Sequence, residues 1–307
     1  MGEIRLTGLK SGVPIGFMAA LGTFRHVMEM PELGEVKLFW TPYAAQWCAA
    51  LSIDGEVSED SLARSLAERV KSMAERPELQ WSNAVKDASR EKYVHAASKA
   101  LEHITPEDHG LADWFAAFGN ELVNSESGTI ESTPFDMTVA RQQFLADAAW
   151  LHKELGTADK KKGDQRNIAS FHEALFEEWK YADDQHSLGW DPGTILLGAF
   201  TSKAPTAMRK AGVRALVWLA MESLPLMPCV FDRGLATRGF RRQGRKQFLR
   251  WPVWETPLSL ACIGTLLSQV IGMDAGERRT RGIAGAYESQ IYKPNKYLTS
   301  FQQPTLL

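Results

Sequence analysis

A run of cations between residues 233 and 250 is the part of the sequence best suited to chemistry, and that chemistry is phosphate binding. The run reads RGLATRGFRRQGRKQFLR and holds seven cations, three glycines, two phenylalanines and no acid. Arginine offers paired donors to phosphate oxygens, and its planar guanidinium also stacks on bases. The run therefore predicts contact with nucleic acid. The alternative is a solvated loop that faces the acidic part of this chain or an acidic protein.

Two further groups of cations precede and follow this run. Four cations between residues 203 and 214 stand before or at the start of an apolar helix, where they oppose the helix dipole unless an anion is bound. If that helix begins near Pro205, they lie on a solvated face instead. Three arginines between residues 278 and 281 form either another phosphate contact or an exposed turn. The residues predicted to bind nucleic acid are Lys203, Arg209, Lys210, Arg214, Arg233, Arg238, Arg241, Arg242, Arg245, Lys246, Arg250, Arg278, Arg279 and Arg281.

The histidines supply the candidates for a rival, catalytic interpretation. His103 and His109 flank Asp108, and His186 follows Asp183, so each set could in principle hold a metal ion. Neither spacing is typical of a known metal site, and the sequence lacks the Walker A, GxSxG and HExxH patterns. We therefore expect no catalytic residue, no metal and no cofactor. A nuclease or RNA-processing enzyme that uses His103, His109 or His186 is the alternative.

The charges of the chain are divided between two regions. The formal net charge is −2, but residues 1–200 hold 19 Lys and Arg against 31 Asp and Glu, whereas residues 201–307 hold 16 against 6. The acidic region would repel a phosphate backbone and the basic region would attract it. We expect the last third of the chain to face nucleic acid and the rest to face protein or solvent.

Hydrophobic periodicity predicts an α+β, helix-rich fold with a mixed N-terminal part, a helical middle and a basic α+β C-terminal third. Expected strands lie at 3–9, 36–40, 229–232 and 247–251, and 43–53 is a strand or a short helix. Expected helices lie at 14–28, 58–73, 86–103, 109–123, 137–155, 168–181, 212–224 and 257–271, with exposed loops at 124–134 and 156–166. Trp251 and Trp254 are expected in the core, with a stacking platform as the alternative. We expect either two lobes, 1–130 and 131–307, or a single domain.

Cysteine usage and hydropathy indicate the compartment. The three cysteines are widely separated, and an odd count favours reduced thiols. The most apolar early stretch, residues 13–24, is shorter than the roughly 20 residues that span a bilayer. We therefore expect a cytoplasmic protein without membrane contact.

Several sequence blocks resemble subunits encoded in type I-G (formerly I-U) CRISPR operons. The opening block is LTGLKSGVPIGFMAALGTFR at 6–25, followed by LFW at 38–40. The later blocks are GWDP at 189–192, GVRALVWLA at 212–220, LPLMP at 224–228, TRGF at 237–240 and RWPVW at 250–254. These are packing and turn patterns at both ends of the chain, and they leave the helical middle largely uncovered.

The resemblance implies a large-subunit-like component of a CRISPR surveillance (Cascade) complex for antiviral defence. Such a subunit would be non-catalytic, would contact CRISPR RNA, target DNA or the short flanking motif, and would help recruit the helicase–nuclease. In these complexes base pairing reads the target, while protein reads backbone and shape. The partners expected are thus nucleic acid, other effector subunits and the helicase–nuclease. A structural adaptor that binds an acidic protein is a further alternative.

Overall fold

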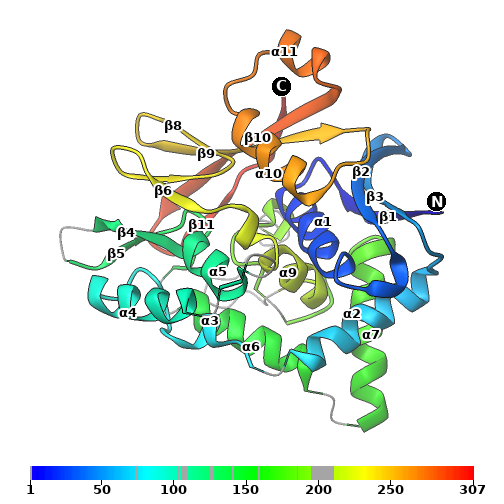
Figure 1. The fold of residues 1–307 in the computed structure, drawn as a ribbon, viewed down its shortest axis with the longest axis horizontal. Helices are drawn as coiled ribbons and strands as arrows, with labels where there is room; N and C mark the ends of the chain where they lie inside the picture. Colours follow the sequence, from blue (N-terminus) through cyan, green and yellow to red (C-terminus); the bar gives the residue numbers. More distant parts are fainter. Residues whose placement is uncertain are drawn as a thin grey trace.

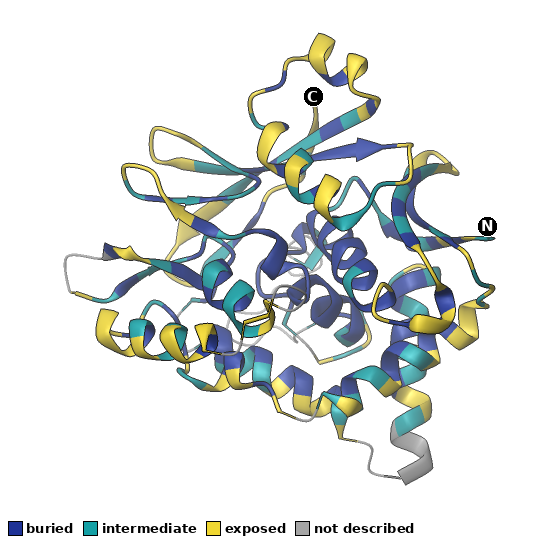
Figure 2. Ribbon diagram, viewed as in Figure 1, coloured by how far each residue is buried: buried dark blue, intermediate teal, exposed yellow. Residues whose placement is uncertain are grey.

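Two buried helices, α1 (Pro14–Val27) and α9 (Arg214–Met221), cross at the centre of the molecule (Figure 1). Almost all of their side chains are buried, as the dark blue ribbon in Figure 2 shows. Pro14 occupies the first turn of α1, where its missing N–H costs nothing. A Cβ atom on Gly22 would lie 1.8 Å from the carbonyl oxygen of Leu219. The crossing therefore depends on a glycine at this position.

The computed structural model describes residues 2–73, 75–102, 104–105, 109–124, 128–139, 142–157, 160–184, 186–194 and 211–307, without the side chains of 124 and 160–163. Three of the predicted contacts, Lys203, Arg209 and Lys210, lie outside these residues, as does His103.

The N-terminal sheet is antiparallel with the strand order β1-β3-β2. Its strands are β1 (Gly2–Lys10), β2 (Val36–Tyr43) and β3 (Gln46–Ile53). Side chains alternate along β2, so that Val36, Leu38 and Trp40 face the core. A short 3₁₀ turn, η1 (Pro31–Leu33), connects α1 to this sheet.

Helices make up most of the middle of the chain and lie along the lower edge of the view in Figure 1. They are α2 (Glu59–Ser72), α3 (Pro77–Gln80), α4 (Arg90–Leu101), α5 (Gly110–Phe118), α6 (Phe144–Gly156) and α7 (Lys160–Phe176). Ser58 begins α2 with a capping box, in which its hydroxyl accepts from the Ser61 N–H. A small hairpin, β4 (Gly119–Asn124) and β5 (Ile130–Ser132), follows α5.

The C-terminal third forms a second antiparallel sheet with the order β11-β10-β9-β8. Its strands are β8 (Phe240–Gln243), β9 (Lys246–Trp254), β10 (Ile283–Asn295) and β11 (Leu298–Phe301), and β12 (Thr305–Leu306) also pairs with β10. The remaining elements are η3 (Leu224–Leu226), the hairpin of β6 (Cys229–Phe231) and β7 (Leu235–Thr237), α10 (Leu260–Gln269) and α11 (Ala275–Thr280).

Two buried tryptophans join this sheet to the N-terminal part. Trp251 donates its indole N–H to the Ser11 carbonyl at 2.8 Å, and Trp254 donates to the Leu38 carbonyl at 2.8 Å. Phe17 of α1 stacks on Trp251 with ring centroids 5.8 Å apart. The core position expected for both tryptophans is confirmed, and neither can serve as an exposed stacking platform.

The predicted α+β, helix-rich fold is confirmed, and several element boundaries are corrected. The helix expected at 137–155 begins at Phe144, because Asp136 accepts from the Thr138 N–H at 3.2 Å and so favours a turn over the helix. The helix expected at 168–181 begins at Lys160, so the exposed loop expected at 156–166 is largely helical. The helix expected at 109–123 ends at Phe118 and the chain continues as β4.

One continuous core extends from Ile4 to Phe301. A lobe boundary between residues 130 and 131 would cut through β5, which pairs with β4. The two ranges expected as lobes therefore share both a hairpin and a core.

Among the described residues, no helix has the length and apolar character needed to cross a membrane. All three cysteines are free thiols, with Cys48 and Cys229 buried and Cys262 exposed.

The crossing of α1 and α9 generates a prediction about Gly22. Replacing Gly22 by Ala should lower the free energy of unfolding by about 3 kcal/mol or more, because the added methyl meets the rigid backbone of α9. Urea denaturation followed by circular dichroism measures this. Gly272→Ala is the matched control, since its Cβ would have no neighbour closer than 4.0 Å. Equal midpoints for the two variants would contradict the close crossing.

Candidate nucleic-acid interface

The strand register brings two turns of the C-terminal sheet to the same end. In the antiparallel pairing of β9 with β10, Phe248 lies opposite Gln290. The chain that precedes Phe248 and the chain that follows Gln290 therefore run toward the same edge of the molecule. The β8–β9 turn at 243–246 and the β10–β11 turn at 295–298 both lie toward that end of the sheet.

These two turns form an exposed surface that combines cations with aromatic rings. We call it the hairpin-end surface and define it by Arg245, Lys246, Tyr292, Lys293, Lys296 and Tyr297, all exposed. Tyr292 and Tyr297 are 42% and 51% exposed, which is high for side chains of this size. Among the described residues, none of the four cations has a carboxylate within salt-bridge distance. Their charge is therefore available to an external anion.

The other predicted cations divide into exposed and internally engaged groups. Arg233 is exposed in the β6–β7 turn, which projects to the same side as the β8–β9 turn in Figure 1. Arg279 is exposed on α11. Arg242 pairs with Glu131 at 3.1 Å, but both side chains are over 40% exposed and such pairs contribute little to stability. These three arginines remain accessible to a phosphate.

Glu288 engages two of the predicted arginines. Arg241 forms a two-point contact with its carboxylate at 2.5 and 2.6 Å, and Arg250 donates to the same group at 2.9 and 3.0 Å. Burial alone would raise the pKa of Glu288, but the two guanidinium groups hold that pKa below its usual value. Both arginines thus have an internal counter-ion, which sequence reasoning had not assigned.

Four more predicted contacts are anchored within the fold. Arg214 starts α9 beside Asp183, whose carboxylate lies 3.7 Å from the guanidinium and accepts from the Arg214 backbone N–H at 3.0 Å. The anion expected at this helix start is thus supplied by the chain itself. The others donate to carbonyl or amide oxygens: Arg238 to Leu226, Arg278 to Met273 and Arg281 to Gln269.

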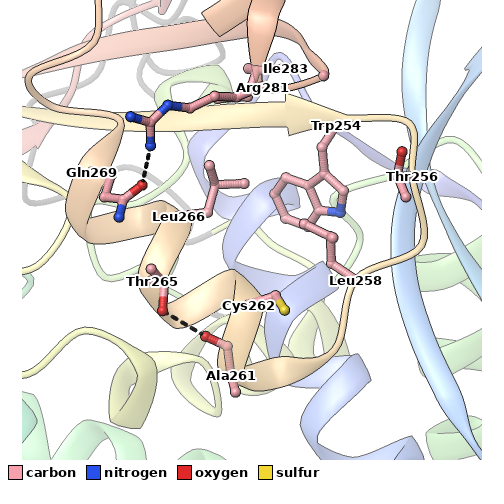
Figure 3. A pocket seen from close by; sticks show the side chains of 11 residues that line it. Trp254, Thr256, Leu258, Ala261, Cys262, Thr265, Leu266, Gln269, Arg281 and Ile283 are labelled. Atoms are coloured by element: carbon pink, nitrogen blue, oxygen red, sulfur yellow. Dashed lines mark hydrogen bonds between the residues drawn. The ribbon is translucent and has the colours of Figure 1, made fainter. Parts of the chain in front are cut away.

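A shallow apolar groove of about 430 Å³ lies at the opposite end of the sheet, between α10 and the strands (Figure 3). Trp254, Leu258 and Ile283 form its walls, and Arg281 borders it while donating to Gln269 at 2.6 Å. Among the lining residues there is no histidine or carboxylate, and Cys262 is the one thiol. The groove therefore holds one cation, which is engaged with Gln269, and no carboxylate or imidazole for acid–base catalysis.

The histidines of the rival interpretation have structural partners. His109 is exposed, and its Nδ1 lies 4.0 Å from Asp113 at the start of α5. His186 accepts at Nδ1 from the Leu188 N–H at 3.0 Å, as a turn residue does. Among the described residues there is no cluster of three or more His, Cys, Asp or Glu that could hold a metal ion.

The strongest electrostatic feature is a buried charge network that sequence reasoning missed. Its centre is Glu222, a fully buried carboxylate just after α9. Arg76 donates to Glu222 at 2.8 Å and also pairs with buried Glu78, and its guanidinium lies over the Trp114 ring. Burial alone would raise the pKa of Glu222, but Arg76, His26 and Arg25 together hold it well below its usual value. Glu222 is therefore ionised in the folded protein.

Two buried histidines complete this network in the neutral form. His26 Nδ1 accepts from Arg69 at 2.8 Å, so the ring proton is on Nε2, and that nitrogen lies 3.1 Å from a carboxylate oxygen of Glu222. His152 Nδ1 accepts from the Trp218 indole at 3.1 Å, and its Nε2 donates to the Met73 carbonyl at 2.6 Å. Burial lowers the pKa of both histidines, and in His152 the nearby Arg76 lowers it further. His152 is thus a hydrogen-bonded buried residue, and the network stabilises the fold rather than presenting a cavity for a ligand.

The neutral histidines generate a prediction about acid stability. Because the unfolded histidines titrate near pH 6.5 while the folded ones resist protonation, the free energy of unfolding should be constant above about pH 6.5 and fall below it. His152→Gln keeps one donor and one acceptor but cannot titrate. It should make the decline between pH 6.5 and 5 shallower by up to about 1.4 kcal/mol per pH unit.

Chemical denaturation at a series of pH values measures this slope. His109→Gln makes the same substitution at an exposed histidine and is the matched control. A decline that is the same in the His152→Gln variant as in the wild type would mean that His152 is not held neutral.

Comparison with known proteins gave no match: no family model, no curated protein and no solved structure is similar to this chain. The resemblance to type I-G CRISPR subunits therefore stays a prediction from the sequence blocks.

Proposed function

We propose that this chain is a non-catalytic nucleic-acid-binding subunit of a type I CRISPR RNA-guided effector complex in the cytoplasm. The proposal that the chain binds nucleic acid rests on the hairpin-end surface. There, four exposed cations lie near two exposed tyrosines, and none of the four has a carboxylate partner among the described residues. Cations that have no internal counter-ion attract the phosphate backbone most strongly. The CRISPR part rests on the sequence blocks.

The proposed role is contact with CRISPR RNA, target DNA or the flanking motif, together with recruitment of the helicase–nuclease. Exposed turns at the end of a sheet suit contacts to backbone and shape. Of the accessible predicted cations, Arg233 in the β6–β7 turn and Arg242 on β8 add positive charge on this side of the molecule, whereas Arg279 on α11 lies at the other end of the sheet. Arg241 and Arg250 are paired with Glu288. The acidic helices between residues 55 and 190 are left to face neighbouring subunits or solvent.

The enzyme alternative predicts a different outcome. A nuclease would cleave labelled RNA or DNA in the presence of Mg²⁺ or Mn²⁺, and the cleavage would depend on His103, His109 or His186. A subunit of the proposed kind binds these substrates in a salt-sensitive way and leaves them intact. An adaptor for an acidic protein binds neither RNA nor DNA with useful affinity.

The proposal predicts a change in salt dependence when the free cations are removed. The variant Arg245→Ala/Lys246→Ala/Lys293→Ala/Lys296→Ala loses up to four phosphate contacts. The slope of log affinity against log salt for duplex DNA should therefore become shallower by about 3 to 4. Fluorescence anisotropy of a labelled duplex between about 50 and 200 mM salt measures the slope.

A matched control removes four exposed cations from the acidic region instead. The variant Arg64→Ala/Lys92→Ala/Lys99→Ala/Lys153→Ala changes the net charge by the same amount at sites remote from the hairpin-end surface. It should leave the slope unchanged. Equal effects of the two variants, or no effect of the first, would contradict the proposed site.

A further inference from the structure

The outer face of the β8–β11 sheet carries a continuous set of side chains that lead to the hairpin-end surface. Glu288 binds both Arg241 and Arg250, and the Arg241 guanidinium lies over the Phe248 ring, so these four residues share one face. The other face is apolar and packs into the core, where Phe240 stacks on Phe301. Because side chains alternate along a strand, Tyr292 projects from the same outer face as Glu288.

This outer face is covered at one end and open at the other. Arg250 donates to the Ile271 carbonyl at 2.8 Å, so the connection between α10 and α11 closes the end near Arg250. Beyond Phe248, exposure increases along both strands toward Lys246 and Tyr292. Figure 2 shows the yellow, exposed turns of the hairpins at this open end.

The planar guanidinium group of Arg241 has a fixed orientation and is partly exposed. Its guanidinium centre lies 4.4 Å from the Phe248 ring centroid, and its edge is fixed by the two-point contact with Glu288. The side chain is still 26% exposed. A guanidinium that is bound along its edge and stacked on one face offers its remaining face to another planar group. Tyr292, two positions beyond the residue opposite Phe248, is near enough in the sheet to hold an adjacent planar group.

The charge around these planar groups is strongly positive. The strands and turns at 240–254 and 283–301 hold seven cations, five in the first range and two in the second, against one carboxylate, Glu288. That carboxylate is already shared between two arginines. The ligand that combines planar apolar rings with a chain of negative charges is nucleic acid with unpaired bases.

We infer that this face and the end of the β10–β11 hairpin bind single-stranded nucleic acid. Bases stack on Arg241, Tyr292 and Tyr297, and phosphates are held by Lys246, Lys293 and Lys296. In a duplex the faces of the bases are covered by the neighbouring base pairs. Exposed aromatic side chains therefore find few base faces on which to stack. In a single strand each base presents a face, and stacking on an aromatic side chain tolerates any sequence. The inference rests on the proposed nucleic-acid-binding function, and it adds that this surface prefers single strands to duplexes.

The test compares single strands with duplexes for the full chain. Anisotropy is measured with a labelled mixed-sequence single-stranded DNA, the same sequence as RNA, and the corresponding DNA duplex, all at one salt concentration. Tyr292→Ala/Tyr297→Ala should raise the Kd for the single strands roughly 10- to 100-fold, because two stacking contacts are lost. The Kd for the duplex should change less than about twofold, and the salt slope should be unchanged since no cation is removed.

Three further variants control this experiment. Tyr292→Phe/Tyr297→Phe retains the rings and should restore single-strand affinity to within about threefold of the wild type. Tyr43→Ala removes a tyrosine of similar exposure, 47%, from the β2–β3 hairpin and should have no effect. Arg241→Lys keeps the positive charge but removes the planar guanidinium group, and should weaken single-strand binding several-fold.

The possible failures are distinct. Equal loss of single-strand and duplex affinity in the tyrosine variant would overturn the stacking inference and leave the proposed function in place. Wild-type protein that binds neither ligand would overturn both. A third outcome is that polyglutamate competes as effectively as single strands do, with the same affinity for the wild type and the tyrosine variant. That result would indicate an acidic protein partner and would also overturn the inference.

Discussion

The ionised carboxylate of Glu222 is the constraint on which the rest of the structure depends. A fully buried charge is costly unless cations and donors surround it, and removing one partner of such a pair typically costs about 3–5 kcal/mol. The partners of Glu222 come from α1 and from the segment before α3, so one interaction fixes the position of α9 relative to both. The same contacts hold α1 close enough to α9 to require Gly22.

Two indole hydrogen bonds connect this N-terminal part of the core to the C-terminal sheet that carries the basic surface. Trp251 and Trp254 attach β9 to the β1–α1 segment and to β2, and β9 in turn carries β8 and β10. The strands are therefore buried where they meet the core and exposed where they end. Cations without a carboxylate partner in the described part of the chain thus gather at the hairpin-end surface, while Arg241 and Arg250, closer to the core, pair with Glu288.

Local signals in the sequence predicted the fold class and many elements, whereas contacts between distant residues could not be predicted. The helix after Pro14, the strand ending at Trp40 and the capped helix after Ser58 depend on neighbouring residues. The strand β10 was missed because Ile283–Asn295 mixes Gly, Ala and polar residues without a clear alternation. The arginine-rich run was recognised, but its division into free and engaged cations depends on Glu288, 38 residues beyond Arg250. Arg76 and Glu222 are 146 residues apart, so no spacing rule could join them.

The central claim is that nucleic acid contacts the positive end of the C-terminal sheet and not the acidic helices. The most direct measurement is crosslinking of the assembled complex to a photoreactive guide or target, followed by mapping of the modified peptides. The account predicts adducts concentrated at 240–250 and 290–297. Adducts found mainly between residues 55 and 190 would contradict it, because local geometry would then have overridden the charge distribution, and the hairpin-end surface would have to be abandoned as the binding site.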